Sequence, residues 1–133
     1  MNKLIIAILF VTNINCFGSE WWNPKQCEFD GLNERNHRMV YDFTCANESA
    51  YSFYVDTETL EIKLLSMSIY DNKKKVYTDI DIKMSDCIAI QYNTDEYNVI
   101  VYKRIYKYKN EEEAYNDIIR VWNKLKYLIV KDF

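Results

Sequence analysis

His37 is the only histidine of the chain, so a catalytic centre of the Ser–His–Asp or Cys–His type would have to use it. Such a centre needs a nucleophile within hydrogen-bond reach of the imidazole ring. His37 stands in the polar run Asn36-His37-Arg38, and no serine or cysteine lies close to it in the sequence. We therefore interpret His37 as an exposed side chain without a catalytic role.

Carboxylates offer another route to hydrolysis, because a pair of them can act as acid and base on a glycosidic bond. Asp79 and Asp81 are two residues apart and would share one face of a strand. That face is too polar for a core, so we expect both carboxylates to face solvent. A secreted hydrolase that uses Asp and Glu is a third hypothesis for this chain.

The sequence lacks the motifs that bind phosphates, metals or cofactors. Phosphate-binding loops and nucleophile elbows need several glycines at fixed spacings, and the chain has 2 Gly. Zinc sites need clustered Cys and His ligands, whereas the cysteines here match no zinc spacing and one His is present. We therefore expect no metal, no cofactor and no enzymatic activity.

The unusual feature of the composition is its aromatic side chains, which make up 16% of the residues and include 12 Tyr. Tyr102, Tyr106 and Tyr108 alternate with lysines, which predicts a strand with one wet and one aromatic face, and Trp21 and Trp22 form a further pair. Tyr and Trp are enriched at binding surfaces because they give a large contact area at small entropic cost. The alternative readings are that Tyr only fills strand positions and that the two Trp pack on the core.

Residues 1–18 follow the order of a secretory signal peptide. Lys3 precedes an apolar run over Leu4–Val11, and small residues follow up to Gly18, after which we place the cut. The apolar run is much shorter than the roughly 20 residues that a membrane span needs. We therefore expect a secreted protein without a membrane span.

Three cysteines remain once residues 1–18 are removed, and export favours their oxidation. We expect a Cys27–Cys45 disulfide, because Cys27 lies in a loop-like stretch that gains most from being tied down; Cys45–Cys87 is the second choice. A bridge that closes a loop of this length contributes about 3 kcal/mol. The odd cysteine is a buried thiol or a link to a second chain, so we expect a monomer or a disulfide-linked dimer.

Asn47 begins the one N-x-S/T sequon of the chain, Asn47-Glu48-Ser49. The sequon lies in a polar stretch between two strand-like runs, where a surface turn is expected. In a eukaryotic secretory route Asn47 is therefore a glycosylation candidate.

The remaining chain divides into an extension over residues 19–37 and a single α+β domain over residues 38–133. The extension shows no sustained period, so we expect it to be loop-like. The domain begins with five to seven runs of alternating apolar and polar residues, rich in β-branched and aromatic types. A change of phase near Leu64–Leu65 predicts a bulge or a bend. Turns are expected at 56–59, 71–75 and 93–98, and the absence of glycine from these three stretches favours loops longer than two residues.

The last segment changes to a helical period. Asn110 with Glu113 three residues later forms a capping-box pattern, and acidic residues fill the first turn. We predict an amphipathic helix from about Glu111 to about Ile129. Its apolar stripe must be buried against the sheet, and its members are Ala114, Ile118, Val121, Trp122, Leu125 and Leu128 or Ile129.

A run of strands closed by a helix with an inward Trp122 is similar to the pleckstrin-homology superfold over residues 39–130. The resemblance implies an antiparallel sheet or a partly closed barrel of five to seven strands. No ligand-binding motif of that family is matched, and Lys73, Lys74 and Lys75 read as a solvated turn. Likeness of fold alone does not carry function.

The acidic balance of the chain bears on its partners. The net charge is −3 and no basic stripe is evident, so we expect no nucleic-acid partner. Export, the missing catalytic motifs and the surplus of aromatic residues favour a small secreted binding protein that engages another protein through an aromatic-rich sheet face or edge. The alternative is a carrier of a lipid or small apolar ligand, with a cavity capped by the helix.

Overall fold

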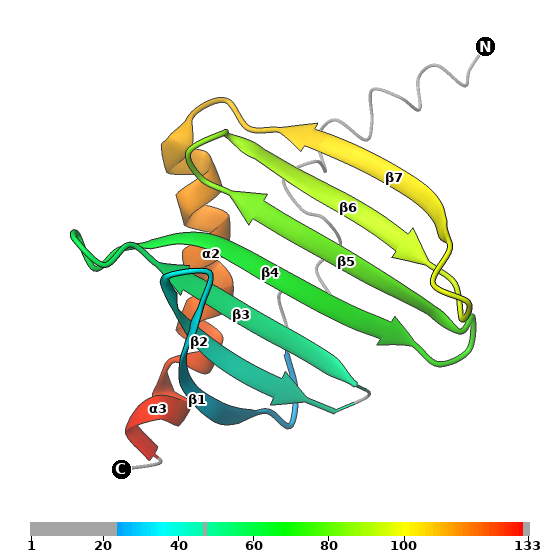
Figure 1. The fold of residues 1–133 in the computed structure, drawn as a ribbon, viewed down its shortest axis with the longest axis horizontal. Coiled ribbons are helices and arrows are strands. Elements are labelled where there is room, and N and C mark those ends of the chain that lie inside the picture. Colours follow the sequence, from blue (N-terminus) through cyan, green and yellow to red (C-terminus); the bar gives the residue numbers. More distant parts are fainter. Residues whose placement is uncertain (1–23, 47, 132–133) are drawn as a thin grey trace.

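The computed structural model describes residues 24–46 and 48–131 and shows the expected α+β fold (Figure 1). Seven antiparallel strands form one open sheet in which each strand pairs with the next along the chain. The strands are β1 (Glu28–Arg35), β2 (Arg38–Cys45), β3 (Ser49–Val55), β4 (Ile62–Asp71), β5 (Val76–Lys83), β6 (Ile88–Thr94) and β7 (Ile100–Lys107). The helices are α2 (Glu111–Leu125) and α3 (Tyr127–Lys131).

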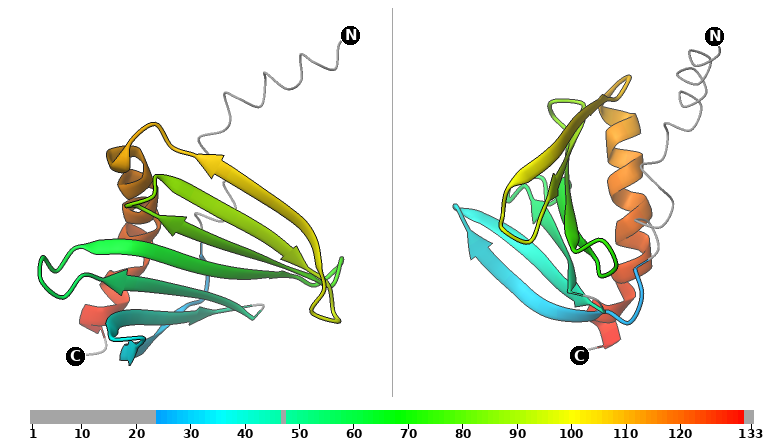
Figure 2. Two further views of the ribbon diagram at one scale, coloured as in Figure 1. Left: turned by 45° about the horizontal axis from the view of Figure 1, so that its top comes forward. Right: turned by 90° about the vertical axis from the view of Figure 1, so that its right-hand side faces the viewer.

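The predicted C-terminal helix is present as α2, which lies across one face of the curved sheet (Figure 2). The side chain of Asn110 accepts a hydrogen bond from the backbone N–H of Glu113 (3.0 Å), so the predicted N-cap is confirmed. The carboxylate of Glu113 in turn accepts from the backbone N–H of Lys109 (3.0 Å). The helix was expected to continue to Ile129, but α2 ends at Leu125 and the short α3 follows.

The core lies between α2 and the face of the sheet that it covers, which we call the inner face. Four residues of the predicted stripe are fully buried there: Ala114, Ile118, Val121 and Leu125. The ring of Trp122 packs on three aromatic rings of β2 and β3, with centroid distances of 5.0 Å to Phe53, 5.1 Å to Tyr41 and 6.2 Å to Phe43. The strands add alternate residues to this core, among them Leu65, Met67, Ile80, Ile82 and Ala89.

The predicted change of phase corresponds to a bulge at the start of β4. Tyr54 pairs with Leu64 while Val55 pairs with Ile62, so Lys63 is the extra residue. The bulge lets both Ile62 and Leu65 reach the core although they are three residues apart.

The loop-like character expected for residues 19–37 does not hold for its second half, because Glu28–Arg35 forms the edge strand β1. Its polar sequence hides the strand, since Gly31 and a bulge between Phe29 and Gly31 break the alternation. Pairing with β2 and the Cys27–Cys45 disulfide, which is confirmed, hold this segment in place. The candidates Trp21, Trp22 and Asn47, and the proposed signal peptide, lie outside the described residues.

Three hairpin loops are stabilised in the same way: the side chain of an aspartate accepts hydrogen bonds from backbone N–H groups of its own turn. Asp56 accepts from Glu58 (2.8 Å) and Thr59 (3.2 Å). Asp71 and Asp95 make the same kind of interaction in the next two predicted turns, with donors two to four residues further on. These bonds satisfy turn N–H groups without glycine.

The three predicted turns join their strands through more than two residues, as expected. The β1–β2 hairpin was not predicted. Its connection is the two-residue turn Asn36–His37, with φ of 54° and 66°. Such primed turns match the twist of paired strands and require two left-handed residues, for which Asn is tolerated and His costs more.

Replacing His37 with glycine is expected to raise the free energy of unfolding by about 1 kcal/mol, because glycine pays no steric cost at positive φ. Urea denaturation measures the change. His37→Ala retains Cβ and is the matched control, for which we expect no gain in stability. If H37G were no more stable than H37A, the turn assignment would be contradicted.

Candidate functional site

Strand β7 exposes an unusual amount of apolar surface at one edge of the sheet (Figure 1). Of the nine large apolar residues that are exposed in the described part of the chain, six lie on β7 or directly before it. Tyr102 and Ile105 retain 50% and 51% of their accessible surface. The remaining four are Tyr97, Val99, Ile100 and Val101.

Two exposed residues of β7, Ile100 and Ile105, lie on the outer face of the sheet, away from α2, and continue onto β6, whereas Tyr102 lies on the inner face. Ile105 pairs with Ile90, and Ile100 pairs with Thr94, two residues beyond Tyr92. We call Ile90, Tyr92, Ile100 and Ile105 the apolar patch. The ammonium group of Lys103 lies 5.6 Å from the centroid of the Tyr92 ring, so a cation covers part of this patch.

The backbone of β7 offers hydrogen-bonding groups beside the apolar patch. The N–H of Tyr108 donates to the carbonyl oxygen of Cys87 (2.7 Å), in register with the β6–β7 pairing. Along an antiparallel ladder, residues bond alternately to the strand on either side. This alternation directs the N–H and C=O groups of Lys103, Ile105 and Lys107 away from β6, where no strand of the described chain pairs with them.

The charge around β7 is positive although the whole chain is acidic. Neither β6 nor the stretch from Val99 to Asn110 contains Asp or Glu. That stretch holds Lys103, Arg104, Lys107 and Lys109. Between β7 and α2 lies a hollow of about 560 Å³, whose charged lining residues are Lys107, Lys109 and Arg120 together with Glu113 and Asp117 of α2.

Only one of the three tyrosines expected at this surface is well exposed. Tyr102 is exposed, whereas Tyr106 is half-buried and packs against the core. Tyr108, expected to contribute to binding, is instead buried with 8% of its surface accessible. Its N–H continues the register with β6, so it lies on the inner face with Tyr106, where α2 covers it.

Tyr108 forms a buried polar pair with Asp117 of α2. Its hydroxyl donates to Asp117 Oδ2 (2.7 Å), and a guanidinium nitrogen of Arg120 lies 3.7 Å from Oδ1. Burial raises the pKa of the Asp117 carboxyl, and it outweighs the opposite effects of Tyr108 and Arg120. Burial, together with the nearby carboxylate, also raises the pKa of Tyr108. The pair anchors the start of α2 to the end of β7.

The outer face at the other end of the sheet is polar and internally satisfied. Asp42 accepts two hydrogen bonds from Arg35 (2.6 and 2.8 Å), one from Asn33 (2.6 Å) and one from Ser52 (2.7 Å). Burial alone would raise the pKa of Asp42, but these bonds lower it below its usual value. Because the polar groups are already paired, this end offers less for a partner to bind than β7 does.

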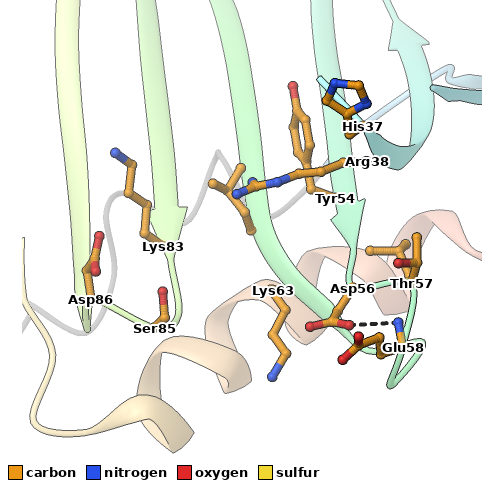
Figure 3. Close-up of a pocket in the computed structure, with 12 residues that line it drawn as sticks. His37, Arg38, Tyr54, Asp56, Thr57, Glu58, Lys63, Lys83, Ser85 and Asp86 are labelled. Atoms are coloured by element: carbon orange, nitrogen blue, oxygen red, sulfur yellow. Dashed lines mark hydrogen bonds between the residues drawn. The ribbon is translucent and has the colours of Figure 1, made fainter. Parts of the chain in front are cut away.

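A second hollow, of about 690 Å³, lies on the outer face near the turns (Figure 3). His37 lines it together with basic and acidic side chains, among them Arg38, Lys83, Asp56 and Asp86. The labelled hydroxyls are those of Tyr54, Thr57 and Ser85, and no hydrogen bond joins one of them to His37 in the described residues. The hollow therefore shows no nucleophile–base pair of the kind that acyl transfer uses.

Comparison with protein-family models, with curated proteins and with solved structures found no match to this chain. Among the described residues, none of the helices is long and apolar enough to cross a membrane. In the same residues, no three His, Cys, Asp or Glu side chains come together in a way that could hold a metal ion. Cys87 has a free thiol and is half-buried.

The raised pKa of Asp117 gives a testable dependence of stability on pH. A carboxyl whose folded pKa lies above its unfolded value stabilises the protein below the unfolded pKa, about 4, and this contribution is lost as the pH rises through the folded pKa. Asp117→Asn still accepts the bond from Tyr108 but does not titrate. We expect the stability of D117N relative to the natural protein to increase as the pH rises above about 4.

Chemical denaturation between pH 4 and pH 8 measures this difference. A difference between the two proteins that stays constant across that range would show that burial does not perturb Asp117.

Proposed function

We propose that this protein is secreted and binds another protein, without catalysis, through β7 and the apolar patch. The observation that carries the proposal is the concentration of exposed apolar side chains on a sheet edge that no described strand pairs with. Contiguous apolar surface on a soluble protein marks an interaction site, and an unpaired edge strand can add a partner's strand to its sheet.

The packing of the inner face favours this proposal over a carrier of apolar ligands. The side chains that would line the cavity of such a carrier are those of the inner face, and α2 fills the space above them with its buried stripe. The two hollows described above are open and lined by charged residues, which suits a lipid tail poorly.

Secretion is supported by the order of residues 1–18 and by the Cys27–Cys45 disulfide. Disulfides persist in oxidising compartments and are rare where thiols are kept reduced. Our proposal therefore places the binding partner outside the cell that makes this protein.

Photo-crosslinking tests the binding surface. With p-benzoylphenylalanine at Ile105, we expect a covalent adduct with a second protein species in the organism that makes the chain, because the side chain lies in the middle of the patch. Leu60 is a matched control, since it is at least as exposed but lies in the β3–β4 turn. Adducts identified by mass spectrometry at Leu60 and not at Ile105 would count against the proposal.

The mass of the secreted protein tests export and the state of the thiols together. We expect the mature chain to begin at Ser19, and alkylation of the unfolded, unreduced protein to modify Cys87 alone. After reduction, Cys27 and Cys45 should be modified as well. A mature chain that retains residues 1–18, or a Cys87 blocked before reduction, would contradict this account.

A further inference from the structure

The two edges of the sheet carry opposite charges and open backbone groups, and we propose that they bind each other between copies of this chain. In this arrangement β1 of one copy adds to β7 of the next as an antiparallel strand. The inference uses the same β7 edge as the proposed function, so a second copy and another protein would compete for it.

The acidic edge is β1. It contains Glu28, Asp30 and Glu34, and its one basic residue, Arg35, is held by Asp42. Leu32, between two of these acids, retains 48% of its accessible surface. An apolar residue flanked by carboxylates on an edge strand is the counterpart of Ile105 flanked by lysines on β7.

The backbone of β1 is open at the same positions. The two-residue turn Asn36–His37 makes Arg35 and Arg38 the hydrogen-bonded pair at the end of the hairpin. Alternation then directs the N–H and C=O groups of Leu32 and Glu34 away from β2. On β7 the outward groups belong to Lys103, Ile105 and Lys107, as derived above.

One antiparallel register satisfies both edges. It places Ile105 opposite Leu32 of the second copy, which brings Lys103 opposite Glu34. Beyond Leu32 the bulge turns Asp30 to the outer face, where it accepts a hydrogen bond from Thr44 (2.6 Å). Opposite charges and apolar pairs directly across from each other stabilise strand pairs. The outward residues of β7 have side chains on the outer face, whereas Leu32 lies on the inner face beside Tyr41. The α2 helices of the two copies therefore lie on opposite sides of the joined sheet.

Pairing of each edge with itself is less favourable. Two copies of β7 joined at Ile105 would place Lys103 opposite Lys107, and two copies of β1 would bring two acidic strands together. Like charges in direct opposition destabilise a strand pair. The charges thus select the head-to-tail contact, which does not close on itself as a two-fold dimer does.

Charge reversal tests the contact by sedimentation at low salt. We expect the natural protein to associate with increasing concentration, weakly, because one added strand makes a small interface. Lys103→Glu and Glu34→Lys should each weaken association about tenfold or more, and the double variant K103E/E34K should recover it. Lys73→Glu, in the β4–β5 turn, is the control and should associate like the natural protein.

Mixing the two single variants gives the sharpest outcome. In the mixture, the intact β7 of E34K meets the intact β1 of K103E, and the two reversed edges also meet with opposite charges, so the mixture should associate where neither single variant does. A natural protein that stays monomeric up to about 1 mM, at which even weak contacts form, would overturn the inference. So would a double variant that does not recover, or a mixture that associates no more than the single variants do alone. None of these results would contradict the proposed function, because position 105 could still crosslink to a different protein.

Discussion

The packing of the α2 stripe against the inner face is the interaction on which the rest of the structure depends. Ile118, Val121 and Leu125 fill the curve of the sheet, and Trp122 covers the aromatic rings of β2 and β3. A helix of 15 residues is about 22 Å long, so it can cover the middle of one face and no more. The outer face and both edges are left to solvent or to partners.

The topology determines which strands become those edges. Because every strand pairs with its neighbour in the chain, the first and last strands must lie at the two ends of the sheet. The sheet curves around α2 but β1 does not pair with β7, so the sheet does not close (Figure 2). The sheet therefore retains two edges, an acidic one at β1 and a basic one at β7, which differ in the charge that they offer to a partner.

Much of the fold could be predicted from the sequence where the signal is local. The cap at Asn110, the buried stripe of α2 and the bulge beside Leu64 each depend on residues a few positions apart. The Cys27–Cys45 pair also followed from position. Strand β1 was missed because its polar sequence is stabilised by pairing and by the Arg35–Asp42 interaction, which no local pattern reveals.

The binding surface could be predicted only in part. Alternation grouped Tyr102, Tyr106 and Tyr108 on one face, but it could not show that α2 covers the end of that face, where Tyr108 contacts Asp117. Exposure of Ile105 and Val101 could not be read from their types, since an apolar residue on a central strand looks the same. The basic residues of β7 were visible in the sequence. That β7 and the acidic β1 form the two edges of one sheet became known only from the strand order.

Residue-resolved amide hydrogen exchange of the free protein, at a concentration where it is monomeric, tests the central claim that β7 is an open edge. The account predicts alternation along the strand: the amides of Arg104 and Tyr106, directed at β6, exchange slowly, while those of Lys103, Ile105 and Lys107 exchange fast. Uniform protection of all five amides would show that another segment already pairs with β7, and the account would then be wrong.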